Sequence, residues 1–184
     1  MRKLRILVDL DDVLNNLLDC WVEMLNKKYN LNAKAQDLKV WNVQAIYPSL
    51  TVEQVYRPIY EKDVWGLMSP RPNSVEYLKK MIDDGHDVLV VTASVYQSLP
   101  VKMDWLFEHF SFLSWDNVVI TRRKQLIRAD VLIDDGIHNL EGGDYVKILI
   151  DNPHNQDYDA AANGMYRVSC LKEAYEVVGD LSNN

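Results

Sequence analysis

Cysteine, glycine and proline are all scarce in this sequence, and it contains no long apolar run. Its 184 residues include 2 cysteines, 7 glycines and 6 prolines. That is too little cysteine for a disulfide scaffold, and too little glycine and proline for a fibrous or disordered chain. The longest uncharged run, residues 88–101, contains Thr, Ser, Gln and Pro and is shorter than the ~20 apolar residues of a membrane span. With 48% hydrophobic residues, the chain suits one globular domain, with or without a modest insertion.

Basic residues are in deficit as well. The chain has 20 Lys and Arg residues against 27 Asp and Glu residues, which gives a net charge of -7. This balance argues against a partner that is a nucleic acid polymer, because such a protein needs a basic face to displace counterions. The acidic cluster at residues 9–12 begins before an apolar signal region could develop, and Cys20 and Cys170 have no motif spacing. We therefore expect a cytoplasmic protein with reduced, packed thiols and no membrane partner.

Short apolar segments alternate with amphipathic helical segments along most of the chain. The predicted strands are residues 4–10, 86–94, 117–120, 131–135 and 146–152, and the predicted helices are residues 13–29, 72–85, 101–110 and 171–181. The first strand is an apolar run rather than an alternating pattern, as expected for a strand that is buried on both faces. The pattern predicts an α/β fold with a doubly wound, Rossmann-like parallel sheet.

Residues 30–70 interrupt this alternation, since they contain helical segments but no buried strand. They predict a small helical cap that is inserted after the first strand and helix, with residues 1–29 and 71–184 forming the α/β core. The segment carries five aromatic residues: Trp41, Tyr47, Tyr56, Tyr60 and Trp65. We expect most of them to pack within the cap, and one or two to face a ligand.

Polar side chains follow four of the predicted strands. They are the sequence DLDD at residues 9–12, Thr92 with Ser94, Lys124, and the pair Asp134 and Asp135. Ligands of parallel α/β sheets bind outside the carboxyl ends of the strands, so these groups are expected to converge. Each like-charged pair of carboxylates would cost up to ~4 kcal/mol at an effective dielectric near 20. The cluster therefore predicts a bound cation.

The types of residue in this cluster indicate a chemistry. An all-oxygen ligand set without His or Cys suits Mg²⁺, which shares its coordination shell with water and substrate phosphate. Thr92 offers a hydroxyl and a backbone amide, and Lys124 offers a point charge, and both groups suit phosphate oxygens. Asp9 and Asp11 are two residues apart on an extended strand end, so both side chains can reach one phosphorus atom. The cluster predicts metal-assisted phosphoryl transfer with a carboxylate as the candidate nucleophile.

In this order, the sequence DLDDV, the strand-end Thr92, Lys124 and the strand that ends in two aspartates resemble the four motifs of the haloacid dehalogenase-like phosphatases. The resemblance spans nearly the whole chain. It implies that Asp9 is the nucleophile that forms an aspartyl-phosphate, and that Asp11 is the general acid and base.

The same resemblance implies the other roles in the site. The implied Mg²⁺ ligands are Asp9 through its side chain, Asp11 through its backbone carbonyl and Asp135 directly, with Asp134 nearby or acting through water. Thr92 and Lys124 would hold the phosphoryl group, and Ser94 is a further candidate for a hydrogen bond to the substrate.

Within that superfamily, four segments resemble the 5'(3')-deoxyribonucleotidases. They are DLDDVLNN, VWNV in the cap, VVTAS and ITRRKQLIRADVLIDDG. The resemblance implies a helical cap, a deoxyribonucleoside monophosphate as substrate, a base stacked on Trp41, and a homodimer. Leu17 stands where that family has an aromatic residue soon after the first motif, and Val40 precedes Trp41.

Three other readings remain open. A related phosphatase could act on a small phosphometabolite that is not a nucleotide, and only the cap residues would distinguish it. A receiver domain of a signalling relay also accepts phosphate on Asp, but its Lys follows its acidic residues, whereas Lys124 precedes Asp134. A binding homologue without catalysis would be expected to lack Asp9 or Asp11. Two histidines at this edge, His138 and His154, match no metal spacing, so we expect both at the surface.

Overall fold

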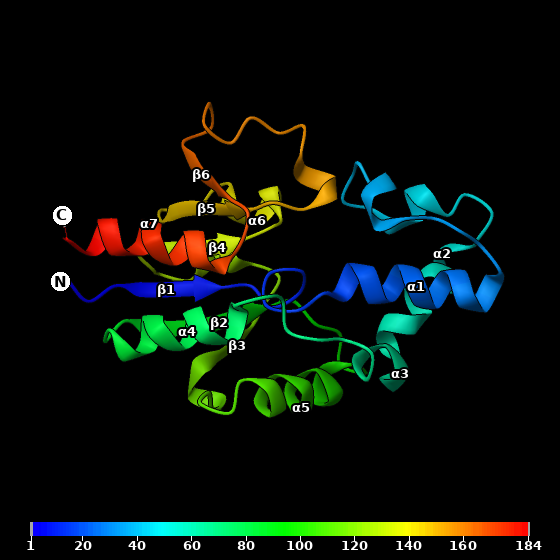
Figure 1. Ribbon diagram of the computed structural model, residues 1–184, viewed down its shortest axis with the longest axis horizontal. Coiled ribbons are helices and arrows are strands. Elements are labelled where there is room, and N and C mark those ends of the chain that lie inside the picture. Colours follow the sequence, from blue (N-terminus) through cyan, green and yellow to red (C-terminus); the bar gives the residue numbers. More distant parts are fainter. Residues whose placement is uncertain (1, 184) are drawn as a thin grey trace.

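Six parallel strands form a single sheet in the computed structural model, which describes residues 2–183 apart from the side chains of residues 62 and 63. The strands are β1 Arg5–Val8, β2 Asp87–Thr92, β3 Val118–Ile120, β4 Val131–Asp134, β5 Val146–Ile150 and β6 Met165–Val168. Their order across the sheet is β3-β2-β1-β4-β5-β6, which places β1 at its centre (Figure 1). The predicted α/β fold with a doubly wound parallel sheet is confirmed.

The edge strand β6 was not predicted from the sequence. It has the sequence MYRV, and its two central residues, Tyr166 and Arg167, are exposed while the outer two are buried. A strand at the edge of a sheet does not need the apolar run that marks a strand buried on both faces. The pattern of residues 165–168 therefore lacks the signal that identified the other five strands.

The two faces of the sheet bury alternate residues of the central strand. On one face, Ile6 and Val8 pack in a core with helices α4 Ser74–Asp83, α5 Leu99–His109 and α7 Leu171–Asn183. On the other face, Leu7 packs with residues from β4 and β5 and from the short helix α6 Ile137–Leu140. Because successive side chains of a strand point to opposite faces, a strand that is covered on both sides has to be apolar at every position.

Helix α1 spans Leu17–Tyr29 and begins four residues later than predicted. A turn occupies residues 11–14, in which Asp12 has a positive φ of 57°. Oδ1 of Asn15 accepts hydrogen bonds from the backbone N of Asp12 at 3.0 Å and of Leu17 at 3.1 Å. These bonds close the turn, and the helix begins after it, although Val13 and Leu14 of the turn are both buried.

The chain between α1 and α4 forms short helical elements beyond the carboxyl edge of the sheet (Figure 1). They are η1 Ala35–Asp37, η2 Val43–Ile46, α2 Val52–Tyr56, η3 Arg57–Tyr60 and α3 Lys62–Trp65. Val43, Tyr47 and Val55 form a second core with Trp21 and Leu25 of α1, so α1 packs with this segment. The limits of residues 30 and 70 for a separate cap domain stay a prediction, and none of the six strands lies between them.

No helix within residues 2–183 is long and apolar enough to cross a membrane.

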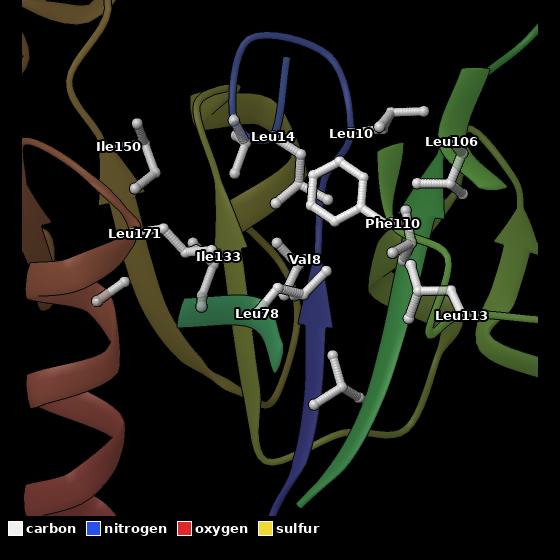
Figure 2. Close-up of a cluster of buried hydrophobic side chains, with 14 of the residues drawn as sticks. Val8, Leu10, Leu14, Leu78, Leu106, Phe110, Leu113, Ile133, Ile150 and Leu171 are labelled. Atoms are coloured by element: carbon white, nitrogen blue, oxygen red, sulfur yellow. The ribbon is translucent and has the colours of Figure 1, made fainter. Parts of the chain in front are cut away.

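Phe110 directly follows α5 and packs in the main core. Figure 2 shows its ring among Leu10, Leu106 and Leu113. The side chain is fully buried, so we expect Phe110→Ala to lower the free energy of unfolding by about 3–5 kcal/mol through lost burial and a residual cavity. Urea denaturation followed by circular dichroism measures this change. Tyr96→Ala is the matched control, because Tyr96 is 87% exposed and its removal is expected to cost within about 0.5 kcal/mol. A loss below about 1 kcal/mol for Phe110→Ala would contradict the packing.

Candidate active site

A cavity of about 540 Å³ is lined by residues of the carboxyl edge of the sheet, of α1 and of the segment of residues 30–70. Its walls include Asp9, Asp11 and Asp135 from the sheet edge, and Trp41 and Tyr56 from the segment above. The register of the sheet explains the convergence, because Val8 at the end of β1 pairs with Val90 of β2 and Ile133 of β4. The loops that follow these strands therefore leave the sheet at one level.

Lys124 joins two of the carboxylates. Its Nζ lies 2.7 Å from Asp9 Oδ1 and 2.6 Å from Asp134 Oδ2, and the residue is only 1% exposed. Burial lowers the pKa of Lys124, but the charges of Asp134 and Asp9 outweigh burial and raise the pKa above its ordinary value. The ammonium group is therefore charged at neutral pH, as a group that holds phosphate must be.

The ionised form of Asp9 remains disfavoured in spite of this ion pair with Lys124. Burial raises the pKa of Asp9 to about 7, Lys124 acts against this rise, and Asp134 adds to it. The Oδ1 atom accepts hydrogen bonds from Lys124 and from the backbone N of Leu10 at 2.8 Å. An additional cation near Asp9 would stabilise the anionic form.

Asp134 is fully buried and is used within the protein. Its Oδ1 accepts hydrogen bonds from the backbone N of Gly136 at 2.8 Å and from Asn139 Nδ2 at 3.0 Å, and its Oδ2 accepts one from Lys124. Asp134 does not line the cavity. Its bonds orient Lys124 and the turn that follows β4.

Asp135, by contrast, has one carboxylate oxygen without a partner. Its Oδ2 accepts a hydrogen bond from Asn152 Nδ2 at 3.1 Å, whereas its Oδ1 is buried and has no hydrogen-bond partner among the described residues. An unsatisfied buried oxygen is costly, by about 1–3 kcal/mol or more when it is charged. Burial, and next the charge of Asp134, raise the pKa of Asp135 well above its ordinary value.

The donor set of this cluster fits a hard divalent cation. One oxygen each from Asp9, Asp134 and Asp135 lie within 4.8 Å of one another. The set contains carboxylate oxygens only, and the unpartnered Asp135 Oδ1 supplies a ligand atom that nothing else in the described chain uses.

Lys102 is a site residue that sequence reasoning missed. Its Nζ forms an ion pair with Asp11 Oδ2 and donates to the carbonyl of Ala93 at 2.8 Å, and the residue is 2% exposed. Asn15 Nδ2 donates to the other oxygen of Asp11 at 3.1 Å. A signal was present in the sequence, because residue 102 shares the apolar face of α5 with Leu99 and Leu106 at helical spacing.

Thr92 and Ser94 take different positions. Thr92 is fully buried and does not line the cavity, and its hydroxyl donates to the carbonyl of Ala93 at 3.3 Å. Ser94 lines the cavity, with its hydroxyl oxygen 3.3 Å from that of Ser98. Leu17, at the position where the resemblance implies an aromatic residue, also lines the cavity.

Trp41 contacts two histidines from the segments that follow β4 and β5. Its ring centroid is 4.5 Å from that of His138 and 4.8 Å from that of His154, both in edge-to-face geometry. Trp41 is 53% exposed and lines the cavity. The expectation that His154 is a surface residue was wrong: its side chain is 7% exposed, and its Nε2 lies 3.2 Å from the carbonyl of Asp135. A strand-end loop position does not reveal this burial, because the contacts of His154 with Trp41 and Asp135 are made with residues distant in the chain.

Comparison with known proteins agrees with this geometry. Residues 2–182 match the family described as 5' nucleotidase, deoxy (pyrimidine), cytosolic type C protein. A 5'(3')-deoxyribonucleotidase of Bacillus subtilis is 35% identical over 153 residues, which are 83% of this chain and 87% of the relative. A 5'(3')-deoxyribonucleotidase of Clostridium acetobutylicum is 28% identical over 95% of this chain and 97% of its own.

Solved structures share the fold. A haloacid dehalogenase-like protein of Streptococcus pneumoniae superposes with a TM-score of 0.67 at 12% identity, over 96% of this chain and 98% of its own. A magnesium-bound haloacid dehalogenase-type hydrolase of Bacillus subtilis superposes with a TM-score of 0.59 at 12% identity, over 97% and 100% of the two chains. The match over residues 2–182 and the 35% identical relative together show that this chain belongs to the family of cytosolic type C 5'-deoxyribonucleotidases, on a haloacid dehalogenase-like fold.

Proposed function

We propose that this protein is a Mg²⁺-dependent phosphomonoesterase that hydrolyses deoxyribonucleoside 5'(3')-monophosphates in the cytoplasm. The observation that carries the proposal is the buried carboxylate cluster, in which Asp135 Oδ1 has no partner among residues 2–183 as described, next to Lys124 and a cavity with aromatic residues in its wall. The names of the relatives and the family description support the substrate and the compartment. The homodimer that the resemblance implies stays a prediction.

The first step is attack on phosphorus by Asp9. Its Oδ1 is already engaged by Lys124 and Leu10, so we assign the attack to Oδ2. A bond forms between Oδ2 and phosphorus while the bond from phosphorus to the leaving alcohol oxygen breaks, which leaves an aspartyl-phosphate. Lys124 would offset negative charge at this edge, and Ser94, which lines the cavity, would donate to a phosphate oxygen.

Asp11 moves the protons of the reaction. In its protonated form it donates a proton to the leaving alkoxide, and as the resulting carboxylate, paired with Lys102, it takes one from the water that hydrolyses the aspartyl-phosphate, which restores the protonated form. Lys102 and Asn15 hold the Asp11 carboxylate at the cavity wall by contacts to its two oxygens. Thr92 is fully buried beneath that wall, so we assign its contribution to the strand-end backbone rather than to the hydroxyl.

Asp9, Asp134 and Asp135 would hold the metal, with Asp135 Oδ1 as a direct ligand and the backbone carbonyl of Asp11 completing the protein ligands. Both oxygens of Asp134 already accept hydrogen bonds, so Asp134 would act on the metal indirectly rather than as a direct ligand. When bound, Mg²⁺ neutralises carboxylate charge and polarises the phosphoryl group.

The cap supplies the substrate contacts away from the phosphate. We propose that the cap comprises residues 30–70 and that Trp41, held by His138 and His154, stacks on the base. Leu17 leaves space where an aromatic residue would narrow the cavity, so we expect the choice of base to rest on Trp41 and its histidine neighbours.

The first test is phosphate release from a panel of 5'- and 3'-deoxyribonucleotides, ribonucleotides and sugar phosphates. We expect deoxyribonucleotides such as dUMP or dTMP to be preferred, EDTA to abolish turnover and added Mg²⁺ to restore it. Asp9→Asn is expected to reduce turnover by at least about a thousandfold, because the amide cannot act as the nucleophile. Asp116→Asn is the control, since Asp116 is exposed and lies away from the cavity.

The panel distinguishes the alternatives. Release from sugar phosphates alone would keep the mechanism and overturn the nucleotide substrate. Release from none of the compounds would overturn the enzyme assignment and favour a binding or signalling role.

Trp41→Ala is expected to lower kcat/KM for deoxyribonucleotides by about 5- to 150-fold, since stacking on an aromatic side chain contributes ~1–3 kcal/mol per base. Hydrolysis of p-nitrophenyl phosphate should change much less, because a substrate without a nucleobase does not use this contact in the transition state. Trp115→Ala is a matched control, since Trp115 is 61% exposed and packs on Phe107 away from the cavity. Equal losses on both substrates would remove Trp41 from the base site.

A further inference from the structure

Arg71 lies where the chain returns from the cap to the core. It connects this returning segment to the segment that leaves the core for the cap. Asn15 and Pro70 form an antiparallel bridge between the outgoing and the returning segment. The backbone N of Arg71 donates to the carbonyl of Leu14 at 2.8 Å, and its Nε donates to the carbonyl of Asn15 at 3.1 Å. Arg71 is thus fastened to the segment that links β1 to α1.

The guanidinium group of Arg71 fixes the orientation of a buried amide. One of its terminal nitrogens donates to Asn152 Oδ1 at 2.7 Å, and Asn152 is 2% exposed. Arginine has donors only, so the amide of Asn152 has to present its oxygen to Arg71 and its nitrogen to the opposite side.

On that opposite side, the nitrogen of Asn152 meets two acceptors. Nδ2 donates to the carbonyl of Asp12 at 3.0 Å and to Asp135 Oδ2 at 3.1 Å, which uses both of its protons. A flipped amide would place its oxygen against two acceptors and its protons against the guanidinium group. The three contacts therefore permit one orientation only.

Asp135 is held from its backbone side as well. Asn155 Nδ2 donates to the carbonyl of Asp135 at 3.0 Å, and Asn155 Oδ1 accepts from the backbone N of Asn152 at 3.1 Å. With its carbonyl and its Oδ2 both fixed, the Asp135 carboxylate cannot rotate freely. Its remaining oxygen, Oδ1, is the buried atom that has no partner among the described residues.

We propose that Asn152, oriented by Arg71, is a positioning residue that fixes the Asp135 carboxylate with Oδ1 available to a divalent cation. The inference rests on the metal site of the proposed function and extends it. It ties the cation affinity of the core to the point where the cap joins the core, because Arg71 belongs to that crossing. Groups that orient metal ligands in this way typically alter metal affinity 10- to 100-fold when they are removed.

A simple charge effect of Arg71 would have the opposite sign. Its guanidinium group is a positive charge on the same side of the molecule as the carboxylate cluster, and its side chain is 27% exposed. If Arg71 acted only through its charge, removing it would strengthen the binding of a cation. The positioning role predicts weaker binding, so the direction of the change separates the two.

The test is titration of the full chain with Mg²⁺ alone by isothermal calorimetry. We expect Asn152→Ala to raise the Kd for Mg²⁺ about tenfold or more, and Arg71→Met to raise it in the same direction by less, since Asn152 remains. Arg71→Lys should stay near the unmodified protein, because an ammonium group also has donors only. The double variant should bind Mg²⁺ no more weakly than Asn152→Ala alone, because Arg71 acts through Asn152.

Two controls define the range of the measurement. Asp135→Asn removes the direct ligand and should bind Mg²⁺ most weakly. Asn117→Ala should match the unmodified protein, because Asn117 Nδ2 donates to the carbonyl of Val88 outside the cavity. Thermal unfolding without and with Mg²⁺ separates folding from binding: the Mg²⁺-induced rise in Tm should shrink in Asn152→Ala and persist in Asn117→Ala.

Unchanged Mg²⁺ affinity in a folded Asn152→Ala variant, or tighter binding in Arg71→Met, would overturn the positioning role while leaving the metal site in place. Should Asn152→Ala not fold, the comparison of Arg71→Met with Arg71→Lys carries the same test, and equal affinities there would overturn the role. Absence of Mg²⁺ binding by the unmodified chain would overturn the metal site itself, and the positioning role with it.

Discussion

Burial of charge at the carboxyl edge of the sheet is the constraint on which the rest of this structure depends. Asp9, Lys124, Asp134 and Asp135 are each 6% exposed or less, in a place where water cannot solvate them well. Such a group is tolerated only when each charge has a partner with good geometry. In the described part of the chain, one ammonium group bridges two carboxylates, and the third carboxylate keeps an oxygen without a partner. Within these residues the cluster is therefore incomplete, which suits a site that binds a cation and a phosphate.

The central position of β1 gives this cluster a rigid support. A strand with neighbours on both sides and cover on both faces is among the most rigid parts of an α/β fold, and Asp9 follows it directly. Asp134 ends β4, which pairs with β1, so its position relative to Asp9 follows from strand register, whereas Lys124 reaches Asp9 from the short helical turn after β3. A site held by register needs few further contacts to stay in place.

Helix α1 connects this edge of the sheet to the segment of residues 30–70. Leu17 and Cys20 of α1 belong to the main core, whereas Trp21 and Leu25 belong to the second core with residues of that segment. The same helix therefore packs with both parts and begins only a few residues after Asp11. Trp41 packs directly on His138 and His154, and all three residues line the cavity, so its wall is built from both parts.

The sequence by itself determined the sheet and the chemical type of the site. Apolar runs that end in Asp9, Thr92 and Asp134 are local signals, and parallel strands bring their carboxyl ends together whatever the details of packing. Lys124 was found because it also follows a strand. The strand β6 was not found, because an edge strand with Tyr166 and Arg167 exposed carries no apolar run.

Only the tertiary structure decided which side chains support these groups. Lys102 reaches Asp11 from a helix 91 residues away, and Asn152 reaches Asp135 from a loop 17 residues away. Both contacts depend on how α5 and the loop after β5 pack against the sheet. The sequence does not distinguish a buried Lys or Asn from an exposed one. The role of the buried residue depends on partners that are distant in the chain. The periodicity of the sequence reports which residues face the core, whereas the pairing of polar groups within it is set by three-dimensional packing.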